Sequence, residues 1–265
     1  MTPAPTGGAG PAGLGRQLGP FGVKDLFTVV NLLSGVAAVG FVVSGSPRAA
    51  GYAVLVGFLA GDLLDGLVAR ATGTGNRFGA QFDTVTDHFV HVLVPGLVMY
   101  EVYRAGGHPV LGLTALGALV LSASIRHAMF AAAPFDFAPC WCGLPRTVTG
   151  FVALSLPLST VFTRLPAAHL TGTVAVVVLS ALGLMPVPYM THRGERGLPI
   201  HVKVLVAVFV TGLPLTFLLA RSHTFDLLLA GVLVFAVAGW APVDAEDRRR
   251  FYSEYRRWWT ELSRR

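Results

Sequence analysis

Long apolar stretches recur along this chain, and most are bounded by Gly, Pro or charged residues. A stretch of about 20 apolar residues crosses the hydrocarbon core of a bilayer as a helix. Backbone groups in lipid must be paired within the segment, which a helix achieves and an isolated strand does not. We therefore predict eight membrane helices, near residues 25–44, 50–70, 84–104, 109–131, 146–163, 170–190, 201–220 and 224–242.

Composition supports the same fold class. Of the 265 residues, 53% are hydrophobic and 13% are charged, whereas soluble domains carry about 25% charged residues. The apolar stretches are continuous, whereas the strands of a membrane barrel alternate. The sequence thus predicts an all-α fold, a polytopic membrane helical bundle. The net charge of +6 arises mostly at segment ends and does not indicate a nucleic-acid partner. Membrane lipids are the expected partners, and a homodimer is a further possibility.

The basic residues also predict an orientation. All Lys and Arg except four fall on one side of the predicted spans; the four are Arg48, Arg104, Arg164 and Arg221. Loops rich in Lys and Arg stay in the cytoplasm. We expect an integral protein of the cytoplasmic membrane, with both termini and the active site on the cytoplasmic side.

The two ends of the chain differ from its centre. Residues 1–20 are rich in Gly and Pro and predict a disordered tail, residues 21–243 form the membrane domain, and residues 244–265 form a cytoplasmic amphipathic tail. In that tail, Phe251, Tyr255, Trp258 and Leu262 recur at helical spacing, with arginines elsewhere. This pattern favours an interfacial amphipathic helix that attracts anionic lipid, although the helix can also pack on its own domain.

Two cysteines flank Trp141. The spacing of Cys140 and Cys142 is poor for a disulfide, and two thiolates alone do not complete a zinc site. We expect both to be buried or interfacial thiols.

Four carboxylates lie near the cytoplasmic ends of the second and third predicted helices: Asp62, Asp65, Asp83 and Asp87. A carboxylate in a membrane helix costs roughly 2.5–3.5 kcal/mol, so a cluster of them needs compensation. Asp62 and Asp65 share a helix face with Gly66 and Ala69, and Asp83 and Asp87 are one turn apart on the next helix. Both acidic faces can therefore line one polar cavity.

Bound divalent cations would relieve the repulsion among these carboxylates. Oxygen ligands favour Mg²⁺ or Mn²⁺ over zinc, and two such ions can bridge a diphosphate. Gly66 and Gly79 allow close approach by substrate or by the opposite helix, and Arg70 is placed to pair with phosphate. Two alternatives stay open: ion pairing with Arg70 and Arg77, and an ion or proton pathway.

The pattern D-x2-D-G-x2-A-R-x8-G-x3-D-x3-D runs from Asp62 to Asp87 without a departure. It resembles the signature of the CDP-alcohol phosphotransferase family. The resemblance implies that Asp62, Asp65 and Asp83 bind metal and the diphosphate, and that Asp87 is both a metal ligand and the catalytic base. The residues expected at the nucleotide or diphosphate are Asn31, Asp62, Gly66, Ala69, Arg70 and Gly79.

The run from Thr28 to Gly35 and the sequence Gly143-Leu144-Pro145 resemble the phosphatidylserine synthase branch of this family. That likeness implies a role in phospholipid biosynthesis, with transfer of a phosphatidyl group from CDP-diacylglycerol to the hydroxyl of L-serine and release of CMP. Bacterial phosphatidylcholine synthases look similar around the third helix. Choline therefore stays open as the acceptor, as do inositol phosphate and glycerol phosphate, and an ion-coupled transporter is the alternative of another class.

The acceptor site is expected near three basic side chains. Serine carries a carboxylate, so its site should offer a cation, and Arg126 lies at the cytoplasmic end of an apolar helix. His88 and His91 flank the acidic cluster, one and four residues after Asp87. We predict that Arg126, His88 and His91 contact the acceptor alcohol or a lipid phosphate. Choline would instead require an aromatic cage.

Overall fold

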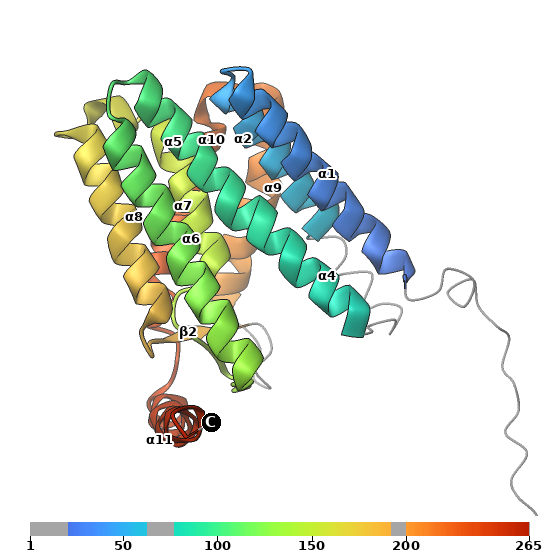
Figure 1. Cartoon of the computed structure of the whole chain (residues 1–265), viewed down its shortest axis with the longest axis vertical. Helices are drawn as coiled ribbons and strands as arrows, with labels where there is room; N and C mark the ends of the chain where they lie inside the picture. Colours follow the sequence, from blue (N-terminus) through green and yellow to red (C-terminus); the bar gives the residue numbers. More distant parts are fainter. Residues whose placement is uncertain (1–20, 63–76, 192–199, 265) are drawn as a thin grey trace, which may run out of the picture.

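The computed structural model describes residues 21–62, 77–191 and 200–264, and they form a bundle of helices (Figure 1). Helical structure occurs in every predicted membrane segment, although the segment predicted near 170–190 ends in strand β2 (Pro188–Met190). The helices are α1 (Val23–Val43), α2 (Pro47–Gly57), α4 (Arg77–His88), α5 (Val94–Ala105), α6 (Pro109–Ala132), α7 (Arg146–Leu158), α8 (Ala168–Leu184), α9 (Ile200–Leu219), α10 (Thr224–Ala238) and α11 (Ala245–Leu262). The all-α prediction is confirmed.

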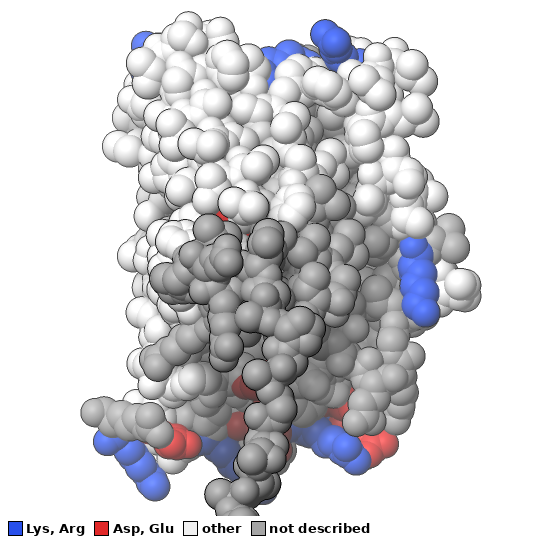
Figure 2. Space-filling model, turned by 90° about the vertical axis from the view of Figure 1, so that its right-hand side faces the viewer, with Lys and Arg blue, Asp and Glu red and all other residues white. Residues whose placement is uncertain are grey.

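Among the described residues, three helical segments are long and apolar enough to cross a membrane: Asp25–Val43, Pro109–Ala132 and Arg221–Ala238. Many of their neighbours are apolar but shorter, so the prediction of eight spans stays a prediction. The outer surface is apolar as well, with Leu113, Val178 and Leu219 more than half exposed. On the face in Figure 2, charged groups gather mainly near the two ends, and the described band between them is nearly free of charge. This surface fits a lipid environment.

Glycine and proline set the turns between antiparallel helices. Gly45 and Gly107 follow the ends of α1 and α5 with φ values of 73° and 81°, a backbone conformation that side chains disfavour. Pro47 and Pro109 then occupy the first turns of α2 and α6, where the missing N–H carries no penalty. Each pair of helices thus folds back at one end of the bundle (Figure 1).

In the described part of the chain, two helices contain a wide π-helical turn. The segment η2 (Phe58–Asp62) continues α2, and η3 (Phe89–Leu93) joins α4 to α5. Such turns occur frequently at functional sites. The helix predicted near residues 84–104 also begins earlier than expected, because α4 already begins at Arg77.

Close helix approach depends on particular glycines. A Cβ on Gly61 would lie 2.8 Å from the backbone nitrogen of Asn31, and one on Gly150 would lie 1.8 Å from the carbonyl oxygen of His91. Neither position can hold a side chain without a backbone shift. Glycines within spans favour such packing, but nothing lies within 4 Å of the Cβ position at Gly40, so that glycine serves no close contact among the described residues.

A short two-stranded sheet closes one end of the bundle, and the helical pattern did not predict it. Strand β1 (Cys140–Cys142) pairs antiparallel with β2 (Pro188–Met190). Both cysteines are buried and free, as predicted.

Helix α11 lies across this end of the bundle, seen end-on below β2 in Figure 1. Phe251 is fully buried, and the indole N–H of Trp258 donates to the carbonyl oxygen of Ala133 over 2.8 Å. The predicted amphipathic helix therefore exists, but its aromatic face packs on the protein. The alternative, in which the helix packs on its own domain, is correct for that face. The predicted domain boundaries stay predictions, and residues 1–20 lie outside the described residues.

Candidate active site

The described residues include only part of the predicted site. Asp62, Asp83 and Asp87 are described, whereas the predicted site residues outside the described part of the chain are Asp65, Gly66, Ala69 and Arg70. The alternative ion pairing with Arg70 and Arg77 also rests on side chains that are not described.

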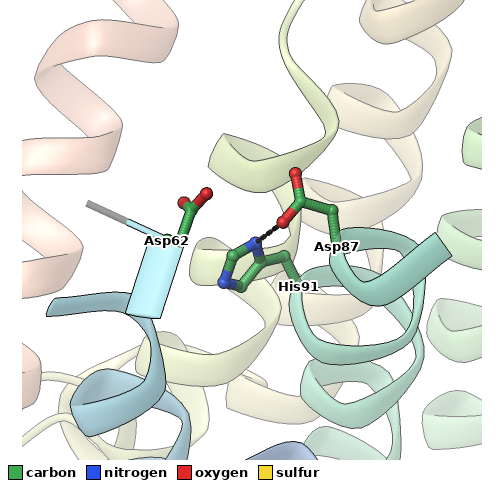
Figure 3. Close-up of side chains that lie close together, drawn as sticks. All are labelled: Asp62, Asp87 and His91. Atoms are coloured by element: carbon green, nitrogen blue, oxygen red, sulfur yellow. Dashed lines mark ion pairs between the residues drawn. The ribbon is translucent and has the colours of Figure 1, made fainter. Parts of the chain in front are cut away.

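Two of the predicted carboxylates meet at one place. One ligand atom from each of Asp62, Asp87 and His91 lies within 4.8 Å of the other two. Asp62 ends η2, Asp87 lies in the last turn of α4, and His91 lies at the centre of η3. In Figure 3 the imidazole stands between the two carboxyl groups, with Nδ1 directed at Asp87. The two acidic helix ends therefore converge as predicted.

His91 is the most enclosed member of this group. Its side chain has no exposed surface, and its Nδ1 lies 3.2 Å from Oδ1 of Asp87. The rings of Phe58 and Phe151 pack against it, with centroids 5.8 and 5.5 Å away. Neither ring nitrogen makes a hydrogen bond of good geometry to another described residue. A buried imidazole without such a partner is suited to a ligand. The sequence suggested an acceptor role for His91, and its position adds metal ligation as a candidate role.

Arg146 is a site residue that sequence analysis missed. It begins α7, and its Nη2 lies 3.5 Å from Oδ2 of Asp87 and 3.5 Å from the carbonyl oxygen of Thr84. The carboxylate of Asp87 thus lies between an imidazole and a guanidinium. One sequence feature hinted at a site role for Arg146: it directly follows the run Gly143-Leu144-Pro145.

Arg126 is held inside the protein rather than extended to the interface. Its Nη1 donates to the carbonyl oxygen of Gly183 over 2.7 Å and to that of Leu144 over 3.3 Å. The Phe130 ring lies 5.1 Å from its guanidinium carbon. A small pocket beside it is lined by Arg126, Arg146, Ser122, Thr149 and Ser180 together with apolar groups. Two arginines therefore border one small, mainly apolar recess, and one of them, Arg146, also contacts Asp87.

The other predicted site residues lie around the group of Asp62, Asp87 and His91. Nε2 of His88 is 3.3 Å from the Ser124 hydroxyl, on the α6 side. Asn31 is fully buried, and its side-chain amide has no hydrogen-bond partner among the described residues. The close contact with Gly61 brings Asn31 beside the segment that ends in Asp62. Asp83 and Gly79 lie earlier on α4, outside the group of three, and their predicted roles stay predictions.

The donor set fits a divalent cation. Carboxylate oxygens suit Mg²⁺ and Mn²⁺, and an imidazole nitrogen favours a transition metal such as Mn²⁺ over Ca²⁺ or Mg²⁺. Asp62, Asp87 and His91 can contribute ligands, and Nε2 of the buried His91 has no hydrogen-bond partner among the described residues.

Comparison with known proteins agrees with this geometry. The model of the CDP-alcohol phosphatidyltransferase family matches residues 22–211, most of the helical bundle. The chain belongs to this family of membrane transferases, which transfer phospholipid head groups.

The chain is also similar to the CDP-diacylglycerol–serine O-phosphatidyltransferase of Methanocaldococcus jannaschii. The two sequences are 22% identical over 221 residues, covering 82% of this chain and 92% of the relative. The resemblance drawn from the acidic motif is therefore confirmed at the level of the family.

Proposed function

We propose that the chain transfers a phosphatidyl group from CDP-diacylglycerol to the hydroxyl of L-serine and releases CMP. The observation that carries this proposal is the convergence of Asp62, Asp87 and His91 beside Arg146, on a chain of this family. The serine-specific relative aligns over nearly its whole length and supports the choice of acceptor.

The small recess beside Arg126 would favour an acceptor that carries negative charge. Arg126 and Arg146 both line it, and a guanidinium binds a carboxylate with two parallel hydrogen bonds. A choline acceptor would require several aromatic faces around a cation. Phe130 already faces the guanidinium of Arg126, whereas the Trp141 ring packs 6.5 Å from that of Phe235. These contacts support serine, or a phosphate-bearing alcohol, over choline.

In the proposed reaction, Asp87 accepts the proton of the serine hydroxyl. The serine oxygen forms a bond to the lipid-linked phosphorus, and the bond from that phosphorus to the bridging oxygen breaks, so CMP leaves with that oxygen. Divalent cations held by Asp62, Asp87 and His91, with the predicted ligands Asp65 and Asp83, would offset negative charge on the phosphoryl oxygens. Arg146 orients the Asp87 carboxylate from one side, and His91 orients it from the other.

The test is CMP release by the purified, reconstituted protein with CDP-diacylglycerol and Mg²⁺ or Mn²⁺. Acceptors are added one at a time: L-serine, choline, inositol phosphate and glycerol phosphate. We expect turnover with serine and little with the others. Turnover with a different alcohol would refute serine specificity but retain the reaction class. Ion flux without CMP release would refute the transferase itself.

The proposal also includes the orientation of the protein in the membrane. The end of the bundle with Arg126, Arg146 and α11 would face the cytoplasm, because the other end holds the four arginines Arg48, Arg104, Arg164 and Arg221. Protease cleavage of the C-terminal tail in inverted but not in right-side-out vesicles would support this orientation.

A further inference from the structure

The outward side of α11 carries two flanks of different charge. At about 100° per residue, Arg248, Arg249, Tyr252, Arg256 and Trp259 fall along one flank of the helix. No acidic residue falls on that flank. The three glutamates of the helix fall on the other flank, where Glu246 pairs with Arg250. Positive charge on α11 is therefore balanced on one flank and unbalanced on the other.

The unbalanced flank is accessible. Tyr252 is 37% exposed and Trp259 is 47% exposed, although both are large aromatic residues. Arg249 and Arg256 are also exposed, whereas Arg248 is half-buried and donates to the carbonyl oxygen of Val243 over 3.1 Å. The aromatic face next to this flank, with Phe251 and Trp258, is buried against the protein, so it fixes the rotation of the helix about its axis. The exposed flank therefore has one fixed direction relative to the helical bundle.

A contact with Trp240, just after the end of α10, sets the level of this flank relative to the bilayer. Trp240 follows the apolar segment Arg221–Ala238 by two residues and is 44% exposed. Tryptophan at the end of a membrane span sits at the level of the lipid head groups. The guanidinium carbon of Arg248 lies 5.4 Å from the Trp240 ring centroid, so the basic flank begins at that level.

The axis of α11 has the matching direction. In Figure 1 the long axis of the bundle is vertical and α11 is seen end-on, so it lies across the bundle rather than along it. A helix with this direction runs parallel to the bilayer surface. Arginines and interfacial aromatic residues on one side of such a helix match anionic lipid head groups.

We propose that the flank formed by Arg248, Arg249, Tyr252, Arg256 and Trp259 docks on the anionic head groups of the bilayer that holds the protein. The buried aromatic face anchors α11 to the domain, and the basic flank binds lipid. This proposal depends on the membrane setting and not on the acceptor alcohol. It corrects the sequence expectation, in which the aromatic face itself entered the head-group layer.

The experiment uses the full chain in nanodiscs of phosphatidylcholine, with or without phosphatidylglycerol, and with a nitroxide on a fraction of the choline head groups. The difference in fluorescence quenching between the wild type and Trp259→Phe isolates the contribution of Trp259. We expect this contribution to rise with phosphatidylglycerol and to fall again at high salt, because the charges are screened.

Two double variants make a matched comparison. R249Q/R256Q removes two charges from the proposed flank, and R250Q/R257Q removes two charges from the opposite flank of the same helix. Each arginine at an anionic surface changes partitioning by about fivefold, so the first pair should abolish the rise with phosphatidylglycerol. The second pair should retain most of it. Circular dichroism of each variant checks that the helix persists.

Three results would overturn the proposal. The first is that Trp259 stays unquenched in every bilayer, as expected if the flank binds a soluble partner. The second is that its quenching is equal in neutral and anionic discs. The third is that both double variants lose the same share of the response, which would indicate a general effect of net charge.

Discussion

The Nη2 of Arg146 lies 3.5 Å from Oδ2 of Asp87, a contact between the first residue of α7 and the last turn of α4. The two residues are 59 positions apart. On its other side, Oδ1 of this carboxylate lies 3.2 Å from Nδ1 of the His91 imidazole. The proposed base is therefore positioned by two different helical segments, and each can be altered separately.

Replacement of Asp87 tests the base. We expect Asp87→Asn to retain binding of the CDP-lipid and to lower turnover by about 10²–10⁴-fold, the usual contribution of a positioned base. CMP release measures turnover, and equilibrium binding of a labelled CDP-lipid measures retention. Turnover close to that of the wild type would remove Asp87 from this role.

Replacement of His91 tests metal ligation. We expect His91→Ala to weaken Mn²⁺ binding by about 10- to 100-fold, as loss of groups at or next to a metal does, and to weaken Mg²⁺ binding less. Electron paramagnetic resonance of free Mn²⁺ gives the affinity without an activity assay. His88→Ala is the matched control, because His88 contacts Ser124 instead. Equal Mn²⁺ affinity in both variants would contradict ligation by His91.

Replacement of Arg126 tests the proposed binding site for the acceptor. We expect Arg126→Gln to raise the KM for serine by about 10- to 100-fold, the usual effect of losing a hydrogen bond to a charged group. The KM for CDP-diacylglycerol should change little. Arg126→Lys keeps the charge and should recover part of the loss. An unchanged serine KM in Arg126→Gln would place the acceptor elsewhere.

The helix contact at Gly150 can be tested by stability. We expect Gly150→Ala to lower Tm and activity together, because its Cβ would lie 1.8 Å from the carbonyl oxygen of His91. Overpacking of this kind typically costs about 1–3 kcal/mol. Gly40→Ala is the control, since nothing lies within 4 Å of its Cβ position. Thermal unfolding in detergent compares the two, and equal Tm values would argue against this packing.

The two cysteines give a prediction for pH dependence. Burial raises the pKa of Cys140 to about 12, and burial raises that of Cys142 to about 11 although Arg126 opposes the shift. Since only the thiolate reacts, both residues should resist alkylation in the folded protein at pH 8. Reactivity should increase only as the pH approaches these values or after denaturation. Rapid maleimide labelling of the native protein at pH 8 would contradict the burial of both thiols.

The pattern of apolar residues predicted the helices well, because a helix depends mainly on residues that are close together in the sequence. Each apolar segment from α1 to α10 has its length and composition in the sequence itself, and Gly45 and Pro47 mark a turn by their own backbone preferences. The convergence of Asp62 with Asp87 was also predictable, because helical spacing placed each carboxylate near the same end of adjacent helices. The described distances agree with that expectation.

Contacts between distant segments were not predictable in the same way. Arg146 follows a proline and begins an apolar helix, and nothing in its neighbourhood indicates Asp87. The pairing of Cys140–Cys142 with Pro188–Met190 likewise depends on how α6 and α8 end. The outward flank of α11 became visible only once burial of Phe251 and Trp258 fixed the rotation of that helix.

The wide turns η2 and η3 have a consequence for how this protein tolerates change in length. A π turn holds one residue more than an α-helical turn, so removing one residue from Phe58–Asp62 would restore regular geometry there. Because the wide turn absorbs that extra residue, the helix on either side would keep nearly the same relative direction after the deletion. A deletion from a regular α-helical turn would instead rotate one side by about 100° relative to the other. Loss of one residue should therefore be less harmful in these two five-residue segments than elsewhere in the same helices, provided that Asp62 and His91 are kept.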